Sequence, residues 1–150
     1  MLKRIVILCV LMLCMTVFNG CGRDVSAIDF MTEFAEEYPL EGKIYCSSAK
    51  RSEEGYMSDE IFRKIYSYEG EIPKDFAVFL NSRPERGAEC GIFRVDNGGT
   101  GIIEEFCLKR IKLISEGKNC GIVLTSGKYI FYSTLDDHEH AKEIFYRLIK

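Results

Sequence analysis

The chain has 150 residues, of which 47% are hydrophobic and 29% are charged, and its formal net charge at pH 7 is −3. This length predicts one globular domain with room for a targeting segment. A negative balance gives no electrostatic basis for binding nucleic acid, whose phosphates favour a basic surface, so the sequence argues against nucleic acid as a partner.

The amino terminus has the pattern of a secretory leader. Lys3 and Arg4 precede an apolar stretch from Ile5 to Phe18 that is interrupted by Thr16. This stretch has the length of a signal-peptide core and is shorter than the roughly 18 to 20 residues that a membrane-spanning helix needs. We therefore predict a signal peptide over residues 1–20 and a folded part on the extracytoplasmic side of the cell membrane.

A cysteine follows this leader directly. The segment Phe18-Asn19-Gly20-Cys21 resembles the lipobox of bacterial lipoproteins, although Phe18 and Asn19 depart from the usual leucine and small residue. We expect Cys21 to be lipidated, because two or more acyl chains such as palmitate anchor a protein stably where one chain does not. Residues 21–25 would then be the attachment point and a short tether. An ordinary cleaved signal and an uncleaved anchor are the alternatives.

The remainder, residues 26–150, is predicted to form a single α+β domain. Helical spacing and N-cap signals predict four helices, which begin at Ser26, Ser58, Ile102 and Thr134. Apolar runs predict four strands, at Lys74–Leu80, Cys90–Val95, Cys120–Thr125 and Tyr129–Ser133. The last two strands are joined by Ser126-Gly127, a candidate for a tight hairpin, and Lys43–Ser47 is a candidate for a short edge strand.

This order, α-α-β-β-α-β-β-α, predicts a two-layer fold with a sheet of about four strands and helices on one face. The similar segments Glu89–Phe93 and Asn119–Val123 suggest a weak internal pseudo-repeat. The first helix has an acidic polar face, so we expect it to pack on the domain and not to lie on a membrane. Arg94 falls among apolar residues, and we expect it at a strand end or on the solvent side, since an unpaired buried charge is costly.

Candidate sites for a cofactor or a metal are weak. Gly99-Thr-Gly101 resembles the start of a dinucleotide loop, but Glu104 stands where a third glycine is required, so we interpret the segment as a flexible loop. Both histidines lie near a helix start, and Asp136, His138 and His140 lack the usual spacing of metal ligands. We therefore expect no cofactor and no metal.

Four thiols follow Cys21 in the chain: Cys46, Cys90, Cys107 and Cys120. Outside the cytoplasm they are permitted to form disulfides, and Cys90 could meet Cys120 if the two similar strands are neighbours. The alternative is that the thiols are buried as small hydrophobic side chains. No Cys-x-x-Cys motif is present, so thioredoxin-like redox activity is not indicated.

The chain resembles a known family in its layout. The lipobox-like start is followed by Tyr56–Tyr66, Asp75–Leu80, Ala88–Phe93 and the helix with Lys109-Arg-Ile, and together these resemble the domain of unknown function 4358 family of small bacterial lipoproteins. The resemblance covers Phe30 to Ile149. It implies a Gram-positive, often anaerobic source, and it transfers no catalytic residues.

Three functions are compatible with these patterns. The leading hypothesis is a membrane-anchored extracytoplasmic module that binds an envelope protein or ligand and is not itself an enzyme. The first alternative is a hydrolase-like envelope enzyme with a site built from the loops Asn81–Gly87 and Asp96–Gly101. The second is a thiol or metal sensor that uses cysteines with His138 or His140.

Overall fold

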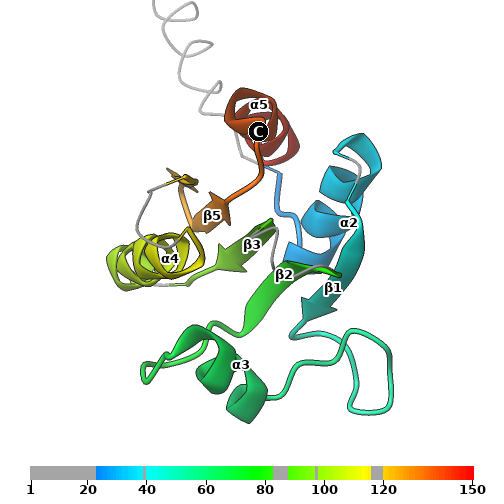
Figure 1. The fold of residues 1–150 in the computed structure, drawn as a ribbon, viewed down its shortest axis with the longest axis vertical. Helices are drawn as coiled ribbons and strands as arrows, with labels where there is room; N and C mark the ends of the chain where they lie inside the picture. Colours follow the sequence, from blue (N-terminus) through cyan, green and yellow to red (C-terminus); the bar gives the residue numbers. More distant parts are fainter. Residues whose placement is uncertain (1–22, 39, 83–87, 97, 116–119) are drawn as a thin grey trace, which may run out of the picture.

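The computed structural model describes residues 23–38, 40–82, 88–96, 98–115 and 120–150, and it has the predicted α+β class. The predicted signal peptide, residues 1–20, and Cys21 lie outside the described residues. The elements in chain order are α2 (Ala27–Glu37), β1 (Gly42–Cys46), α3 (Asp59–Tyr66), β2 (Asp75–Asn81), β3 (Glu89–Arg94), α4 (Thr100–Ile114), β4 (Ile122–Ser126), β5 (Tyr129–Ser133) and α5 (His138–Leu148). The strands form one sheet in the order β1-β2-β3-β5-β4, with every neighbouring pair antiparallel (Figure 1).

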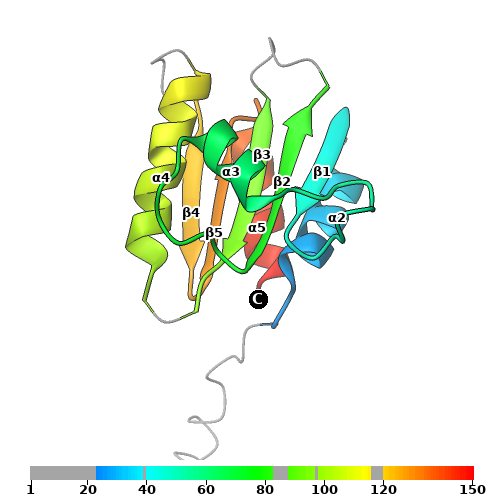
Figure 2. The ribbon, with the colours of Figure 1, turned by 90° about the horizontal axis from the view of Figure 1, so that it is seen from below.

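Helices cover both faces of the sheet, so the prediction of two layers with helices on one face is wrong (Figures 1 and 2). Helices α2 and α5 pack on one face, and α3 and α4 pack on the other. The reason lies in the central strands, which are apolar at consecutive positions and therefore need cover on both sides. On β5, for example, Phe131 joins the core under α2 and α5, whereas Ile130 and Tyr132 join the core under α3 and α4.

The sheet has five strands because the candidate edge strand near Lys43 forms. Strand β1 pairs along its whole length with β2. The two halves of the predicted pseudo-repeat are not equivalent in space, since Glu89–Phe93 lies in the inner strand β3, whereas Ile122 and Val123 of the second half lie in the edge strand β4. Strand β5 separates the two, so β3 and β4 are not neighbours.

Two of the four predicted helix starts are confirmed, and α4 begins at Thr100, two residues before the predicted Ile102. Ser26 caps α2 by accepting a hydrogen bond from the Asp29 amide, and Ser58 caps α3. The cap of α5 lies three residues later than predicted, because the Asp137 side chain, and not Thr134, caps the helix. The Thr134 hydroxyl instead bonds to the backbone of Glu89, at 2.8 Å from its nitrogen and 3.0 Å from its oxygen, which ties the end of β5 to the start of β3.

Candidate functional site

The residues that directly follow the predicted anchor are packed on the folded domain. The backbone of Val25 both donates to and accepts from the Tyr129 hydroxyl, at 2.9 and 3.0 Å, and the Val25 side chain is buried. Arg23 pairs with Glu33 of α2, with their closest atoms 2.9 Å apart. The predicted tether of residues 21–25 is therefore shorter than the sequence suggests, because its second half belongs to the domain.

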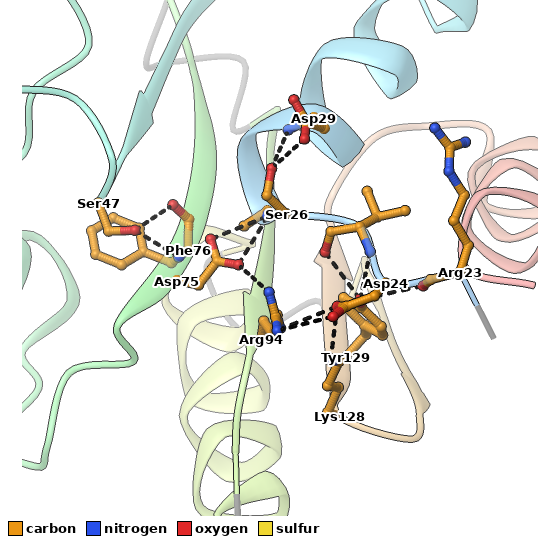
Figure 3. Close-up of polar contacts among 12 residues, drawn as sticks. Arg23, Asp24, Ser26, Asp29, Ser47, Asp75, Phe76, Arg94, Lys128 and Tyr129 are labelled. Atoms are coloured by element: carbon orange, nitrogen blue, oxygen red, sulfur yellow. Dashed lines mark hydrogen bonds and ion pairs between the residues drawn. The ribbon is translucent and has the colours of Figure 1, made fainter. Parts of the chain in front are cut away.

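Asp24 is the centre of the polar contacts at this end of the sheet (Figure 3). Its carboxylate lies 2.8 Å from the Lys128 ammonium and 3.3 Å from the Arg94 guanidinium, and its Oδ1 atom is 3.2 Å from the Tyr129 hydroxyl oxygen. The hydrogen bond from Lys128 lowers the pKa of Asp24, with help from Arg94 and against a smaller opposing effect of burial. Burial in turn raises the pKa of the Tyr129 hydroxyl, which keeps it protonated as a donor.

Arg94 also reaches a second carboxylate. It is the last residue of β3, as expected of a charge at a strand end, and it pairs with Asp75 at 3.5 Å. Asp75 accepts from the Ala27 amide, so its charge lies at the amino terminus of α2, where the helix dipole favours it. We call Asp24, Asp75, Arg94, Lys128 and Tyr129 the tether cluster.

A groove of about 590 Å³ opens beside the tether cluster. Its walls come from the chain between α3 and β2, the start of β2, the end of β3 and the start of α4. Asp75 and Arg94 belong to both the groove and the tether cluster. The other charged residues that line it are Glu71, Lys74 and Asp96, and its apolar residues include Ile72, Pro73, Ile102 and Ile103.

The groove presents donors and acceptors together with apolar surface. The Nε atom of Arg94 is buried and makes no hydrogen bond within the part of the chain that the structure describes. Gly99 is the N-cap of α4 and lines the groove, and it provides no side-chain acceptor for the first amides of this helix. Ile102 adds an apolar side chain that is 65% exposed. Such a surface can hold a ligand that carries both polar and apolar groups.

A second polar cluster lies at the other end of β3, and it is closed. Arg110 of α4 holds the Glu89 carboxylate with two hydrogen bonds, of 2.9 and 2.6 Å, and donates a third to the Ile65 carbonyl at 3.0 Å. The Tyr132 hydroxyl donates to Glu89, and the Tyr66 and Tyr132 hydroxyls lie 3.2 Å apart. We call Glu89, Arg110, Tyr66 and Tyr132 the buried cluster.

Burial dominates the electrostatics of the buried cluster. It raises the pKa values of Tyr66 and Tyr132 well above the ordinary value, and the Glu89 charge adds to this effect. For Arg110, burial opposes the charged form, but the hydrogen bonds and charge of Glu89 outweigh it, so its pKa is raised. Gly91 leaves space for the Tyr132 ring, since a Cβ there would lie 2.6 Å from a ring carbon. The cluster joins α3, α4, β3 and β5, and we assign it a structural role.

The weak metal candidates lie at the start of α5, where His138 is the first helical residue. Asp136 is exposed, and Asp137 caps α5 through the His140 amide at 3.0 Å. The His140 ring lies beside Tyr38, with ring centroids 5.7 Å apart. Among the described residues, no three histidine, cysteine or carboxylate side chains gather as a metal site.

Cysteines do not pair in the way the similar strands suggested. Cys90 is fully buried in β3, whereas Cys120 is exposed before β4, with β5 between the two strands. Cys46, Cys90 and Cys107 are buried thiols, and burial raises the pKa of both Cys90 and Cys107. A buried thiol with a raised pKa is a poor nucleophile and a poor metal ligand.

The described ends of the two loops of the hydrolase hypothesis lie at opposite ends of β3. The first joins the end of β2 to the start of β3, and the second follows the end of β3. They therefore leave the sheet at opposite ends, and the second, with Asp96 and Gly99, borders the groove. No helix among the described residues has the length and apolar character needed to cross a membrane.

By its geometry, the protein is an α+β domain with an open, partly polar groove beside residues 23–25. Comparisons with protein-family models, curated proteins and solved structures found no match to this chain. Sequence reasoning missed the tether cluster, apart from the strand-end placement of Arg94, because its members come from four separate parts of the chain.

Proposed function

We propose that this protein is a lipid-anchored extracytoplasmic module that binds an extended segment of an envelope protein in the groove. The observation that supports this most is the packing of residues 23–25 on the domain. It places the groove beside the point at which the chain would leave for the membrane. The resemblance to small bacterial lipoproteins is consistent with the same proposal.

The distance to the membrane follows from the covalent chain. If Cys21 carries the acyl chains, two residue steps separate it from Arg23, and an extended chain covers about 7 Å in that length. Arg23 is itself tied to the domain, through Glu33 and through its amide, which donates to the Lys150 carbonyl at 3.3 Å. The groove would then face the lipid headgroups or lie at their level, within reach of proteins in the same membrane.

The composition of the groove favours a polypeptide over a polyanion. Carboxylates and cations alternate along its walls, and a polyanion would meet repulsion from Glu71, Asp75 and Asp96. A peptide supplies backbone donors and acceptors for these charges and for the first amides of α4, and its side chains can cover Ile72 and Ile102. Binding by such grooves uses an apolar centre with a polar rim.

The anchor is tested on the protein purified from its native membrane. The expected result is a mature amino terminus at Cys21 with the added mass of a diacylglyceryl group and, where it is N-acylated, a further acyl chain. The Cys21→Ala form should lose this mass and leave the membrane fraction. An unmodified protein with an intact leader, or one recovered from the cytosol, would contradict the anchor.

The groove is tested separately, with a photo-crosslinking residue at position 102 of the full chain in native cells. Ile102 lines the groove and is 65% exposed, whereas Leu113, on the same helix and 63% exposed, is outside it and serves as the matched control. We expect position 102 to capture one envelope protein that position 113 does not, and Arg94→Ala to reduce the capture. Equal capture from both positions would refute the groove as the binding site.

A further inference from the structure

Strand β4 forms an unprotected edge of the sheet. It is the outermost strand beyond β5 among the described residues, and its sequence Ile122–Ser126 contains no charged residue and no proline. In an antiparallel ladder alternate residues direct their amide and carbonyl groups away from the neighbour, so one side of β4 offers a row of backbone donors and acceptors. Natural edges usually carry charges, prolines or bulges that prevent pairing, and β4 has no charge or proline to do so.

Helix α4 presents a patterned row of side chains along this edge. Glu104, Leu108 and Lys112 are spaced four residues apart and so share one face of the helix. Glu104 accepts a hydrogen bond from the Thr125 hydroxyl of β4, and Leu108 and Lys112 line a shallow hollow with Gly121, just before β4. The row therefore runs along the edge strand in the order acidic, apolar, basic, and Leu108 is 58% exposed at its middle.

We propose that the flank formed by β4 and the Glu104–Leu108–Lys112 row binds a second copy of this chain about a two-fold axis perpendicular to the sheet. Such an axis pairs β4 with its copy as antiparallel strands and joins the two sheets into one. It also sets the two α4 helices antiparallel, so that Glu104 of each chain faces Lys112 of the other and the two Leu108 side chains meet at the axis. The row is thus complementary to itself, which is the requirement for a two-fold interface.

The spacing of the layers agrees with this arrangement. Helix α4 packs on both β4 and β5, and Figure 1 shows it on the same face of the sheet as α3. A helix centred between two strands that are about 4.8 Å apart lies roughly 2.4 Å inside the outer strand. Pairing β4 with its copy adds another 4.8 Å, which brings the two helix axes to about 10 Å, within the usual range for packed helices. Strand pairing and helix packing can therefore form together.

The test is site-directed crosslinking of the full chain in native cells. All variants carry Cys120→Ser, because Cys120 is exposed near the flank. In this background, Leu108→Cys treated with a short thiol crosslinker should give a species of twice the mass, several-fold above the parent. Leu113→Cys is the control, since Leu113 is 63% exposed on the same helix but points away from the row. No doubled species from position 108, or an equal yield from position 113, would overturn the proposal.

A charge exchange tests the pairing itself. Adding Lys112→Glu to Leu108→Cys should reduce the doubled species several-fold, because Glu104 of one chain then faces a carboxylate of the other. Adding Glu104→Lys as well reverses both charges and should restore the yield. Failure of this rescue, or a crosslinked product that contains a different protein, would overturn a two-fold contact of this chain with itself. Every variant keeps Cys21 and the groove unchanged, so the difference in yield between positions 108 and 113 reports neither the proposed anchor nor the groove.

Discussion

Strand β3 has a charged residue at each end, and the two charges differ in how deeply they are buried. Glu89 begins the strand as a carboxylate that is held by Arg110 in the core, and their side chains are 8% and 14% exposed. Arg94 ends the strand as a guanidinium between Asp24 and Asp75, with its side chain 27% exposed beside an open groove. The first cluster joins four elements of the fold, and the second joins the amino-terminal segment to the domain and borders a space for a ligand.

The difference shows that burial decides what an ion pair does. In the core, charges without a partner are very costly, so each member of the buried cluster is required by the others. At the surface, water competes for every charge, and a pair contributes little to stability but stays available to a partner. We therefore expect the buried cluster to control folding and the tether cluster to control the position of residues 23–25 and the proposed binding in the groove.

The largest effect is expected for Arg110→Ala. It leaves the Glu89 carboxylate buried without its counterion and should lower the free energy of unfolding by about 3–5 kcal/mol. Denaturation in urea measures this, with Arg94→Ala as the matched change at the other end of β3, for which we expect about 1 kcal/mol or less. The double variant Glu89→Leu with Arg110→Met should lose less than Arg110→Ala alone. Equal losses for Arg110→Ala and Arg94→Ala would remove the distinction between the clusters.

The buried tyrosines predict a loss of stability in alkali. The pKa values of Tyr66 and Tyr132 in the folded state lie well above the ordinary 10.0, so their contribution is complete below that pH. It decreases as the pH rises further, because the unfolded chain releases these protons first. Phenolate absorbance followed beside circular dichroism should show part of the eight tyrosines ionising only with unfolding. Ionisation of all eight in a folded protein would contradict this expectation.

A smaller effect is expected for Tyr129→Phe in the tether cluster. The Tyr129 hydroxyl bonds to the amide and carbonyl of Val25, and its loss should cost about 1–2 kcal/mol. Hydrogen exchange of the Val25 amide should accelerate more than exchange in the core strands, because the change releases residues 23–25 locally. Tyr146→Phe, the same change on α5, is the control and should leave the Val25 amide protected.

The smallest effect concerns Asp24. Its pKa is lowered, so its contribution to holding residues 23–25 is present above the ordinary value of 3.8 and is lost as the pH falls through its folded pKa. Salt should weaken the same contacts, because Asp24 is exposed and its pairs are screened. Hydrogen exchange of the Val25 amide should therefore increase in acid and in high salt beyond the intrinsic change, and Asp24→Asn should reduce both dependences to the part that the Arg23–Glu33 pair contributes. Unchanged protection in the Asn variant would show that Asp24 does not hold the segment.

Local patterns were sufficient to predict much of the fold. The caps at Ser26 and Ser58 and the hairpin after Ser126 depend on residues that are close in sequence, and all three are present. The prediction failed for layers and neighbours. The sequence pattern predicts helices on one face of the sheet only. In the structure all five residues of β5 are buried, which requires cover on both faces. The predicted start of α5 is wrong because Thr134 and Asp137 can both cap a helix. The contact of Thr134 with Glu89 leaves Asp137 as the cap.

By itself, the sequence determined the α+β class and most helices and strands, since these depend on the periodicity of apolar residues and on local caps. The tertiary structure decided which charges meet. Asp24 lies 70 residues from Arg94 and 104 from Lys128 in the chain, yet contacts both. The strand order brings them together, and strand order depends on the packing of the whole sheet between two helical layers. A single sequence holds no direct signal of such distant contacts, so the groove and the self-complementary flank became visible only in the folded molecule.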